Sequence, residues 1–269
     1  MPKLITTRTR IADLGKPRII VIGGGFGGLE VIKGLKGLKA QVVLFDKYNH
    51  HTFQPLLYQV ATSGLETSAI VAPFRKLFGT QNDFYFRLAE VIKVTPEENY
   101  IETSIGGVKY DYLVIATGAS ANFYGMTEVQ KLSSSMKSIV DATKLRNKII
   151  RQLEYALLTD DAEVINSLMD FVIVGGGPTG VELAGALSEL KRNVFPKDYK
   201  ELDMREMDIH IVEASSRLLN GMSEIAGKKA FEFLTEMGVK IHLNTAVKSY
   251  DGFEINLSTG EKLISRSLI

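Results

Sequence analysis

Two glycine-rich turns carry the residues most able to do chemistry in this 269-residue chain. A pyrophosphate group needs backbone N–H donors at close range, and glycine allows this approach because it has no side chain. Each turn follows a short apolar run and precedes a helical pattern, so the start of the helix adds favourable partial positive charge. The sequence therefore predicts two dinucleotide sites. Their residues are Gly23, Gly24, Gly25, Phe26, Gly27 and Gly28 in the first turn and Gly175, Gly177, Thr179 and Gly180 in the second.

An acidic residue follows the first turn where it could accept hydrogen bonds from ribose hydroxyl groups. Asp46 lies 18 residues after Gly28 and ends an apolar strand predicted over 41–45. A strand, a glycine turn, a helix, a second strand and an acid in this order are typical of a dinucleotide-binding βαβ unit. Because all five parts are present, we interpret the first turn as a nucleotide site and not as a packing feature.

The second turn has its own acidic residue, at a longer spacing. Glu213 lies 38 residues after Gly175, and we attribute the excess to a charged insertion over 193–208 between the helix and the next strand. A carboxylate at this position would pair with a free 2′-hydroxyl group and repel a 2′-phosphate. Glu213 therefore favours NADH over NADPH, although Arg217 could turn toward a phosphate.

The pattern of strands and helices around the first turn is repeated around the second. Near-helical spacing of Leu29, Ile32, Leu35 and Leu38 predicts the first of the two helices. The predicted strand that ends at Ile115 closes 92 residues after Gly23, and the one that ends at Ile269 closes 94 residues after Gly175. We expect an α/β fold of two Rossmann-like, doubly wound βαβ domains, each with an antiparallel β-hairpin insertion.

Four segments follow from this repeat. We predict an N-terminal tail over 1–16, frayed in solvent, and a first nucleotide domain over 17–120. A connecting segment with a helix is expected over 121–164, and a second nucleotide domain over 165–269. Since a chain that leaves one such domain for another commonly returns to complete the first, we expect the chain to continue beyond this sequence with a return segment.

Charge and composition exclude several classes of function. The chain has 32 basic and 31 acidic residues, so no large basic field is available to attract nucleic acid. It contains no cysteine, which removes disulfides, thiolate metal sites and electron transfer through a protein dithiol. No metal site is expected, because the histidines do not cluster with carboxylates at the spacing of metal ligands. These are His50, His51, His210 and His242, and the first two are interpreted as loop residues.

Two nucleotide sites in one chain predict electron transfer between two bound cofactors. A nicotinamide donates hydride and a flavin accepts it, so the protein needs little acid–base apparatus. Its main contribution is position, which is worth several kcal/mol of the barrier in comparable intramolecular reactions. No apolar run approaches the roughly 18 residues that cross a bilayer, and no secretory signal is present, so we expect a cytoplasmic protein.

Two segments carry a family resemblance that composition and spacing alone could not show. The segment 49–64, Asn-His-His-Thr-Phe-Gln-Pro-Leu-Leu-Tyr-Gln-Val-Ala-Thr-Ser-Gly, follows the first βαβ unit. The segment 175–185, Gly-Gly-Gly-Pro-Thr-Gly-Val-Glu-Leu-Ala-Gly, contains the second turn. Together they resemble type II NADH:quinone oxidoreductases, and the similarity covers nearly all of the chain from Pro17 onward.

The resemblance implies the FAD/NAD(P)-binding fold, with FAD at the first turn and NADH at the second. It implies that Asp46 and Lys47 hold the adenosine end of FAD and that Val91 offers backbone contacts to the adenine. Glu182 would be the catalytic residue between the nicotinamide and flavin sites, or simply an acid in the first turn of a helix. Other residues would approach the flavin end, namely Ala116, Thr117, Gly118, Phe53, Pro55 and Leu56.

The resemblance also implies partners. In this family a quinone accepts the electrons without proton pumping, and C-terminal helices attach the protein to the inner face of the cell membrane. We expect the same of a complete protein containing this chain, and a homodimer remains open. Two alternatives remain: another NADH-dependent flavin oxidoreductase, and a non-catalytic module that binds NADH and signals through a partner. Absence of cysteine argues against the relatives that pass electrons through thiols.

Overall fold

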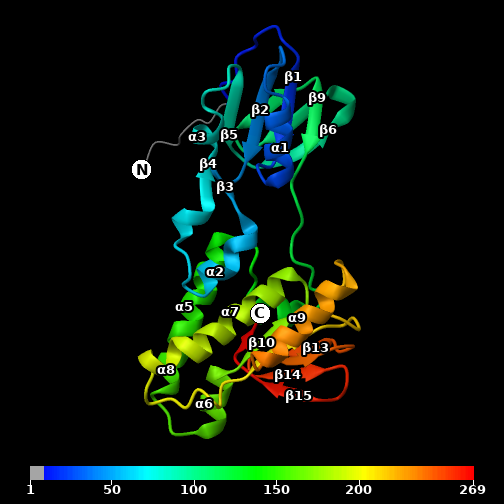
Figure 1. Ribbon diagram of the computed structural model, residues 1–269. Coiled ribbons are helices and arrows are strands. Elements are labelled where there is room, and N and C mark those ends of the chain that lie inside the picture. The colour runs from blue at the N-terminus through cyan, green and yellow to red at the C-terminus, as the bar shows by residue number, and fades with distance from the viewer. Residues whose placement is uncertain (1–8) are drawn as a thin grey trace, which may run out of the picture. The chain divides into compact units, whose positions relative to one another are not determined.

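The two glycine turns lie in different units of the chain (Figure 1). The computed structural model describes residues 9–269. Unit 1 contains the chain up to Phe53 and the segment Val71–Ser120. Unit 2 contains Gln54–Ile70 and Ala121–Ile269.

This division differs from the predicted domain order at residues 54–70. The prediction places them inside one continuous domain over 17–120, whereas they pack within unit 2. Helix α2 (Leu57–Ala61) buries three apolar side chains and lies on α5 (Ile139–Ala156) and α7 (Pro178–Asn193). The predicted connector over 121–164 also belongs to unit 2, because α5 supplies much of the surface that α2 covers.

A parallel four-stranded sheet forms the centre of unit 1. Its strand order is β5-β2-β1-β9, and every neighbouring pair is parallel. These strands form because their residues are almost all apolar, as expected when both faces of a parallel sheet are covered. The bounds are β1 (Arg18–Ile22), β2 (Gln41–Asp46), β5 (Phe84–Leu88) and β9 (Tyr112–Ile115).

Alternate side chains of this sheet enter two apolar clusters. Val21 and Leu44 face helices α1 (Phe26–Gly34) and α3 (Phe74–Phe78) on one side of the sheet. Ile20 and Phe45 pack on the other side, against Ile101 and its neighbours. The first βαβ unit is thus held by burial on both faces.

Helix α1 is shorter than the apolar spacing predicted. It ends at Gly34, and Leu38, predicted as part of its apolar face, is 58% exposed. Gly37 has a φ of +89°, a conformation that a helix cannot contain. The predicted apolar face is therefore present from Leu29 to Leu35, which contact one apolar cluster, and it does not extend to Leu38.

The insertion in unit 1 has three strands, where a hairpin was predicted. Antiparallel pairing gives the order β6-β7-β8. After the short η3 helix (Pro96–Glu98), Asn99 turns the chain with a φ of +48°. The strands are β6 (Val91–Thr95), β7 (Tyr100–Thr103) and β8 (Gly106–Lys109).

A two-stranded antiparallel ribbon marks where the chain leaves unit 1 and returns. Strand β3 (His50–Thr52) pairs with β4 (Val71–Pro73). Between them, η1 (Gln54–Leu56), α2 and η2 (Thr67–Ile70) belong to unit 2.

The predicted tail over 1–16 lies partly outside the described residues. From residue 9 onward it is held against unit 1 and is not frayed. The guanidinium group of Arg87 donates to the carbonyl oxygens of Thr9 and Arg10, and Lys16 forms an ion pair with Asp83. Ile11 packs against the apolar cluster that contains Ile101.

Unit 2 repeats the parallel sheet of unit 1. Its strand order is β12-β11-β10-β16, again parallel throughout. Helix α7 follows β10, and α9 (Glu224–Glu236) follows β11, as expected for βαβ units. The strands are β10 (Phe171–Val174), β11 (Ile209–Val212), β12 (Lys240–His242) and β16 (Ser267–Leu268).

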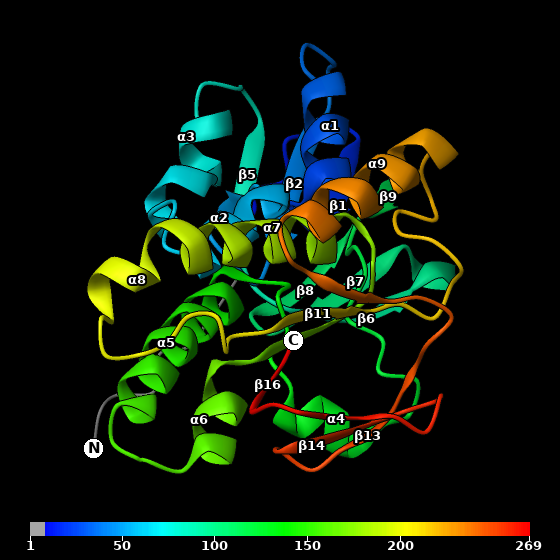
Figure 2. The same cartoon turned by 60° about the horizontal axis from the view of Figure 1, so that its bottom comes forward.

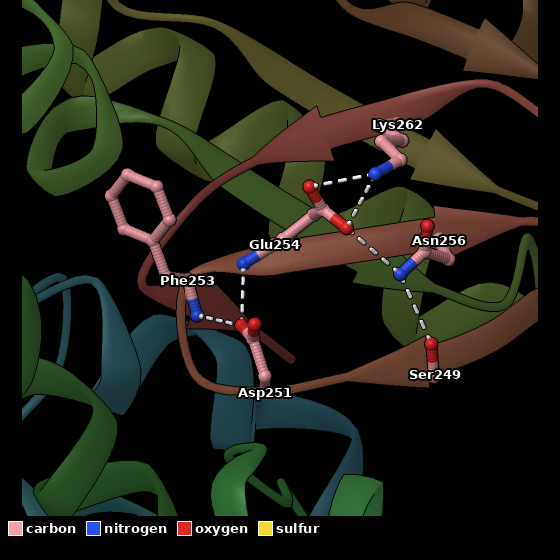
Figure 3. A network of polar contacts seen from close by, with 6 residues as sticks. All are labelled: Ser249, Asp251, Phe253, Glu254, Asn256 and Lys262. Atoms are coloured by element: carbon pink, nitrogen blue, oxygen red, sulfur yellow. Dashed lines mark hydrogen bonds and ion pairs between the residues drawn. The ribbon is translucent and has the colours of Figure 1, made fainter.

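The insertion in unit 2 also has three strands and is organised by one aspartate (Figure 3). Asp251 accepts hydrogen bonds from the backbone N–H groups of Phe253 (2.8 Å) and Glu254 (2.7 Å), which closes the turn between the first two strands. Lys262 donates to Glu254 across the sheet at 3.0 Å. The strands are β13 (Val247–Tyr250), β14 (Glu254–Leu257) and β15 (Lys262–Ile264).

Helices cover the remaining surfaces of unit 2. Figure 2 shows α4 (Thr127–Leu132) beside β13 and β14, where Val129 enters their apolar cluster. Helix α5 begins with a capping box in which Ser138 and Asp141 bind each other's backbone N–H groups. The predicted insertion over 193–208 contains α8 (Phe195–Asp198), and α6 (Ala162–Met169) precedes β10. Over residues 9–269, no helix has the length and apolar character needed to span a bilayer.

Candidate nucleotide-binding sites

The outer glycines of each turn bring strand and helix into close contact. Gly23 has a φ of +98° and Gly175 a φ of +111°, which side-chain-bearing residues rarely adopt. A Cβ atom on Gly28 would lie 1.9 Å from the carbonyl oxygen of Gly23. The corresponding distance from Gly180 to the oxygen of Gly175 is 2.0 Å. Both turns therefore need glycine at the same two places for the same steric reasons.

The middle glycine of each turn is required for a different reason. Gly25 and Gly177 are the N-cap residues of α1 and α7, in extended conformation, and a Cβ atom on either would meet nothing within 4 Å. Neither helix has a side-chain cap or an acidic residue in its first turn. The first N–H groups of a helix lack intrahelical acceptors. An anionic pyrophosphate can thus reach open backbone donors at both turns, so the residues present fit this group.

The predicted acids hold the second glycine of each turn. Asp46 accepts hydrogen bonds from the N–H groups of Gly24 and Tyr48 at 2.6 and 2.8 Å. Glu213 accepts from those of Gly176 and Ser215, both at 2.6 Å. Each carboxylate uses one oxygen atom for the turn and the other for the residue two positions later. A carboxylate has about four lone-pair positions, so each retains capacity for a ribose hydroxyl group.

These hydrogen bonds also set the charge state of Glu213. Burial alone would raise the pKa of its carboxyl group, but the hydrogen bonds from Ser215 and Gly176 outweigh burial and lower this pKa from its ordinary value. Glu213 is therefore ionised at neutral pH, and both of its oxygen atoms can accept hydrogen bonds.

The segment Ala116–Gly118 begins directly beside the first turn. Ala116 donates its N–H to the carbonyl oxygen of Ile22 at 2.8 Å, continuing the pairing of β9 with β1. A Cβ atom on Gly23 would lie 2.4 Å from the carbonyl oxygen of Ala116. Gly118 has a φ of +71°, and Thr117 and Gly118 are exposed.

Three predicted contacts lie at the margins of the two turns. Lys47 directly follows Asp46 and is exposed, and Thr179 is exposed in the first turn of α7. Val91 begins β6 and is half-buried, and the nearby Ala89 donates its N–H to the carbonyl oxygen of Asp46 at 2.9 Å. This hydrogen bond continues the pairing of β2 with β5, two residues before β6 begins.

Glu182 lies in the second turn of α7 and not in the first. The helix begins at Pro178, so Glu182 is its fifth residue, too far along for the simple interpretation as an acid at the helix start. The side chain is half-buried, and burial raises the pKa of its carboxyl group.

Arg217, which could have met a 2′-phosphate, binds its own loop instead. Its guanidinium group donates to the carbonyl oxygens of Asn220 (2.9 Å) and Met222 (3.1 Å). The side chain stabilises the approach to α9.

The sequence interpretation missed the role of His51, which it placed in a loop. His51 lies in β3, is 8% exposed and has its Nδ1 atom 3.0 Å from the carbonyl oxygen of Gly24. Its ring stands edge-on to that of Phe26, as does the ring of Phe53, at centroid distances of 5.0 and 5.4 Å. A three-residue strand gives too little alternation to show which of two adjacent histidines is buried.

Known proteins are similar to this chain in sequence. Type II NADH:quinone oxidoreductase Ndh of Mycobacterium tuberculosis is 32% identical over 253 residues, which are 93% of this chain and 55% of that protein. External NADH-ubiquinone oxidoreductase 2 of Saccharomyces cerevisiae mitochondria is 29% identical, over 92% of this chain and 47% of that protein. These relatives confirm the resemblance predicted from the sequence, and the chain spans about half of their length.

Solved structures give the same result for the fold. The structure of NDH2 from Plasmodium falciparum in complex with NADH superposes with a TM-score of 0.87 at 26% identity, covering 94% of this chain and 54% of that one. The sulfide:quinone oxidoreductase of Aquifex aeolicus, at 19% identity and a TM-score of 0.74, shares the fold. The predicted α/β class with Rossmann-like sheets is therefore confirmed. Since the model of one family matches residues 17–266, the chain belongs to the pyridine nucleotide-disulphide oxidoreductase family.

Proposed function

We propose that this chain is the nucleotide-binding part of an NADH:quinone oxidoreductase that does not pump protons, with FAD held by unit 1 and NADH by unit 2. When bound, FAD supplies the hydride acceptor and the route of electrons onward to a quinone. The observation that carries the proposal is the duplicated turn. Both copies combine a left-handed first glycine, an open middle glycine and an acid on the second glycine.

The residues of unit 1 bind and orient FAD in this proposal. Backbone N–H groups at Gly25 to Gly28 hold the pyrophosphate, and Asp46 and Lys47 hold the adenosine end. The main chain of Val91 contacts the adenine, and Ala116–Gly118 limits the space beside the cofactor. Support comes from the close approach of Ala116 to Gly23 and from the open donors at the start of α1.

The residues of unit 2 do the same for NADH. Open donors at Gly177, Thr179 and Gly180 hold the pyrophosphate, and the ionised Glu213 accepts from the 2′-hydroxyl group and repels a 2′-phosphate. Arg217 donates its hydrogen bonds to carbonyl oxygens of its own loop. A group on the 2′ position of the ribose would therefore meet the negative charge of Glu213.

Glu182 is proposed as the catalytic residue that contacts the nicotinamide. It lies on the helix whose first residues form the second turn, and burial raises the pKa of its carboxyl group. A carboxyl group in this state can hold or release a proton nearer to neutral pH than an exposed glutamate does.

The quinone step and the membrane belong to the whole protein in this proposal. The names of the relatives support a quinone as acceptor. Attachment to the inner face of the cell membrane from the cytoplasm is part of the proposal, and so is a homodimer.

The proposal is tested by titrating the purified chain with FAD and then adding NADH without oxygen. We expect the flavin to bind, its visible absorption to bleach on addition of NADH, and a short-chain quinone to restore it. Binding of NADH with no binding of FAD would contradict the proposal and favour a non-catalytic NADH-binding module. Bleaching that only oxygen or another acceptor reverses would favour a different flavin oxidoreductase.

A further inference from the structure

The buried side chain of His51 contacts the first turn directly. Its Nδ1 atom lies 3.0 Å from the carbonyl oxygen of Gly24. A carbonyl oxygen can only accept, so Nδ1 must carry the hydrogen in this contact. Both the neutral Nδ1–H form and the imidazolium form can donate this bond, whereas the other neutral form cannot.

Gly24 is held from three sides without any ligand. Its N–H donates to Asp46 at 2.6 Å and its carbonyl oxygen accepts from His51. Its remaining side lies on the ring of Phe74, where a Cβ atom would be 2.1 Å from the Cζ atom. Phe74 is completely buried, so this contact cannot move aside easily.

The hold on the carbonyl group determines where the next N–H points. The carbonyl of Gly24 and the N–H of Gly25 belong to one planar trans peptide, so they point in opposite directions. Because His51 keeps the carbonyl group inward, the N–H of Gly25 is directed outward. Gly25 is exposed and has open space beside it, where the candidate pyrophosphate site lies.

Unit 2 satisfies the corresponding carbonyl group differently. The oxygen of Gly176 accepts from the backbone N–H of Leu219 at 2.7 Å, and the N–H of Gly176 donates to Glu213. Both groups of Gly176 are therefore held as in unit 1, but its carbonyl group is held by the main chain. A side-chain substitution can remove the hold in unit 1 and has no equivalent in unit 2.

We propose that His51 is a positioning residue for the pyrophosphate of the dinucleotide in unit 1, acting through the carbonyl group of Gly24. The proposal rests on the proposed function in that unit 1 binds FAD. The edge-on ring of Phe26, 5.0 Å away, helps to keep the imidazole in place. Such a prearranged donor lowers the ordering cost of binding.

The test measures dissociation constants of FAD, ADP and NADH for the 269-residue chain and its variants. His51→Phe keeps an aromatic ring beside Phe26 and removes the donor. We expect it to weaken binding of FAD about tenfold, the effect of one lost hydrogen bond. ADP carries the pyrophosphate without the flavin and should weaken by the same factor at the FAD site. Binding of NADH should not change.

Three further variants separate the donor from the ring. His51→Asn places an amide donor near the position of Nδ1 and should bind FAD within about threefold of the original chain. His51→Gln places its amide near Nε2 and should be as weak as His51→Phe. His50→Phe is the matched control, because within residues 9–269 the ring of His50 has its only hydrogen bond with the neighbouring Asn49, at 2.8 Å. It should leave binding of FAD unchanged.

Several results would overturn the proposal. Equal affinities of His51→Phe and the original chain would show that the donor does not matter. Equal losses in His51→Asn and His51→Gln would show that the ring matters and its donor does not, and this comparison holds even where His51→Phe fails to fold. A loss for FAD with none for ADP would assign His51 to the flavin end. If the original chain bound no FAD, the proposed function itself would fail.

Discussion

At the scale of single residues, each turn has glycines that the fold requires and a glycine that it does not require. The sequence motif alone does not distinguish the two kinds. Gly28 is needed by the fold, since a Cβ atom there would strike the oxygen of Gly23. Gly25 is not needed by the fold, because its conformation is extended and its surroundings are open. Because Gly25 also lies beside the open N–H groups at the start of α1, a ligand that approaches these donors explains the absence of a side chain there.

A substitution at Gly25 should therefore affect binding of FAD and not the stability of the fold. Gly25→Ala should leave the unfolding temperature of the chain unchanged and weaken binding of FAD at least about tenfold, because the new methyl group occupies space needed by the pyrophosphate. Calorimetry and a flavin fluorescence titration measure the two quantities. Gly34→Ala, at the other end of α1 and also in open space, is the control and should leave binding unchanged. Normal FAD affinity in Gly25→Ala would place the pyrophosphate elsewhere.

At the scale of elements, the junction between α6 and β10 contains an unfavourable charge. Burial is the main cause that raises the pKa of Asp170 from 3.8 to about 7, and the nearby carboxylate of Asp208 also raises it. Its Oδ1 atom accepts from the backbone N–H of Asp208 at 2.6 Å, a contact that opposes the shift and fixes the start of β10 beside that of β11. The aspartate thus holds two strands together at a cost in desolvation.

The sign of its pH dependence follows from linkage. Because the folded state holds the proton more tightly than the unfolded state, the free energy of unfolding falls as pH rises from about 4 to about 7. Asp170→Asn keeps an acceptor for Asp208 and loses the charge. We expect it to stabilise the chain by about 1 to 2 kcal/mol at pH 8, after allowance for solvent screening, and by about zero at pH 4.

Chemical denaturation at both pH values measures this effect. Asp160→Asn, at an exposed position before α6, is the control and should show no such difference. A stabilisation by Asp170→Asn that is equal at pH 4 and pH 8 would contradict the assignment to charge.

At the scale of the whole molecule, local patterns predicted what depends on local geometry. The turns and the parallel strands next to them follow from glycine positions and apolar spacing, which act over a few residues. The destination of residues 54–70 could not be predicted in this way, since α2 is placed by long-range contacts with α5 and α7. The role of His51 was missed for the same reason: its partner is 27 residues away in the chain.

The duplication predicts that the two sites can be removed separately. Gly28→Ala should abolish binding of FAD and spare that of NADH, and Gly180→Ala should do the reverse, because each clash lies within one unit at 1.9 or 2.0 Å. Parallel titrations of both variants with both nucleotides check this. Loss of both nucleotides in either variant would show that the units do not bind independently.

Residues 54–70 lie in unit 2, although the chain on both sides of them belongs to unit 1. Leu57, Val60 and Ala61 are at most 2% exposed, so unit 2 is completed by chain that comes from between two parts of unit 1. A protease that cut once after Ser120 would leave two polypeptides, but the first would still be anchored in the second by this inserted helix. Such a nicked protein should migrate as one species until it is denatured. The second half expressed alone would lack the apolar side chains that α2 adds to unit 2, and the first half alone would expose them.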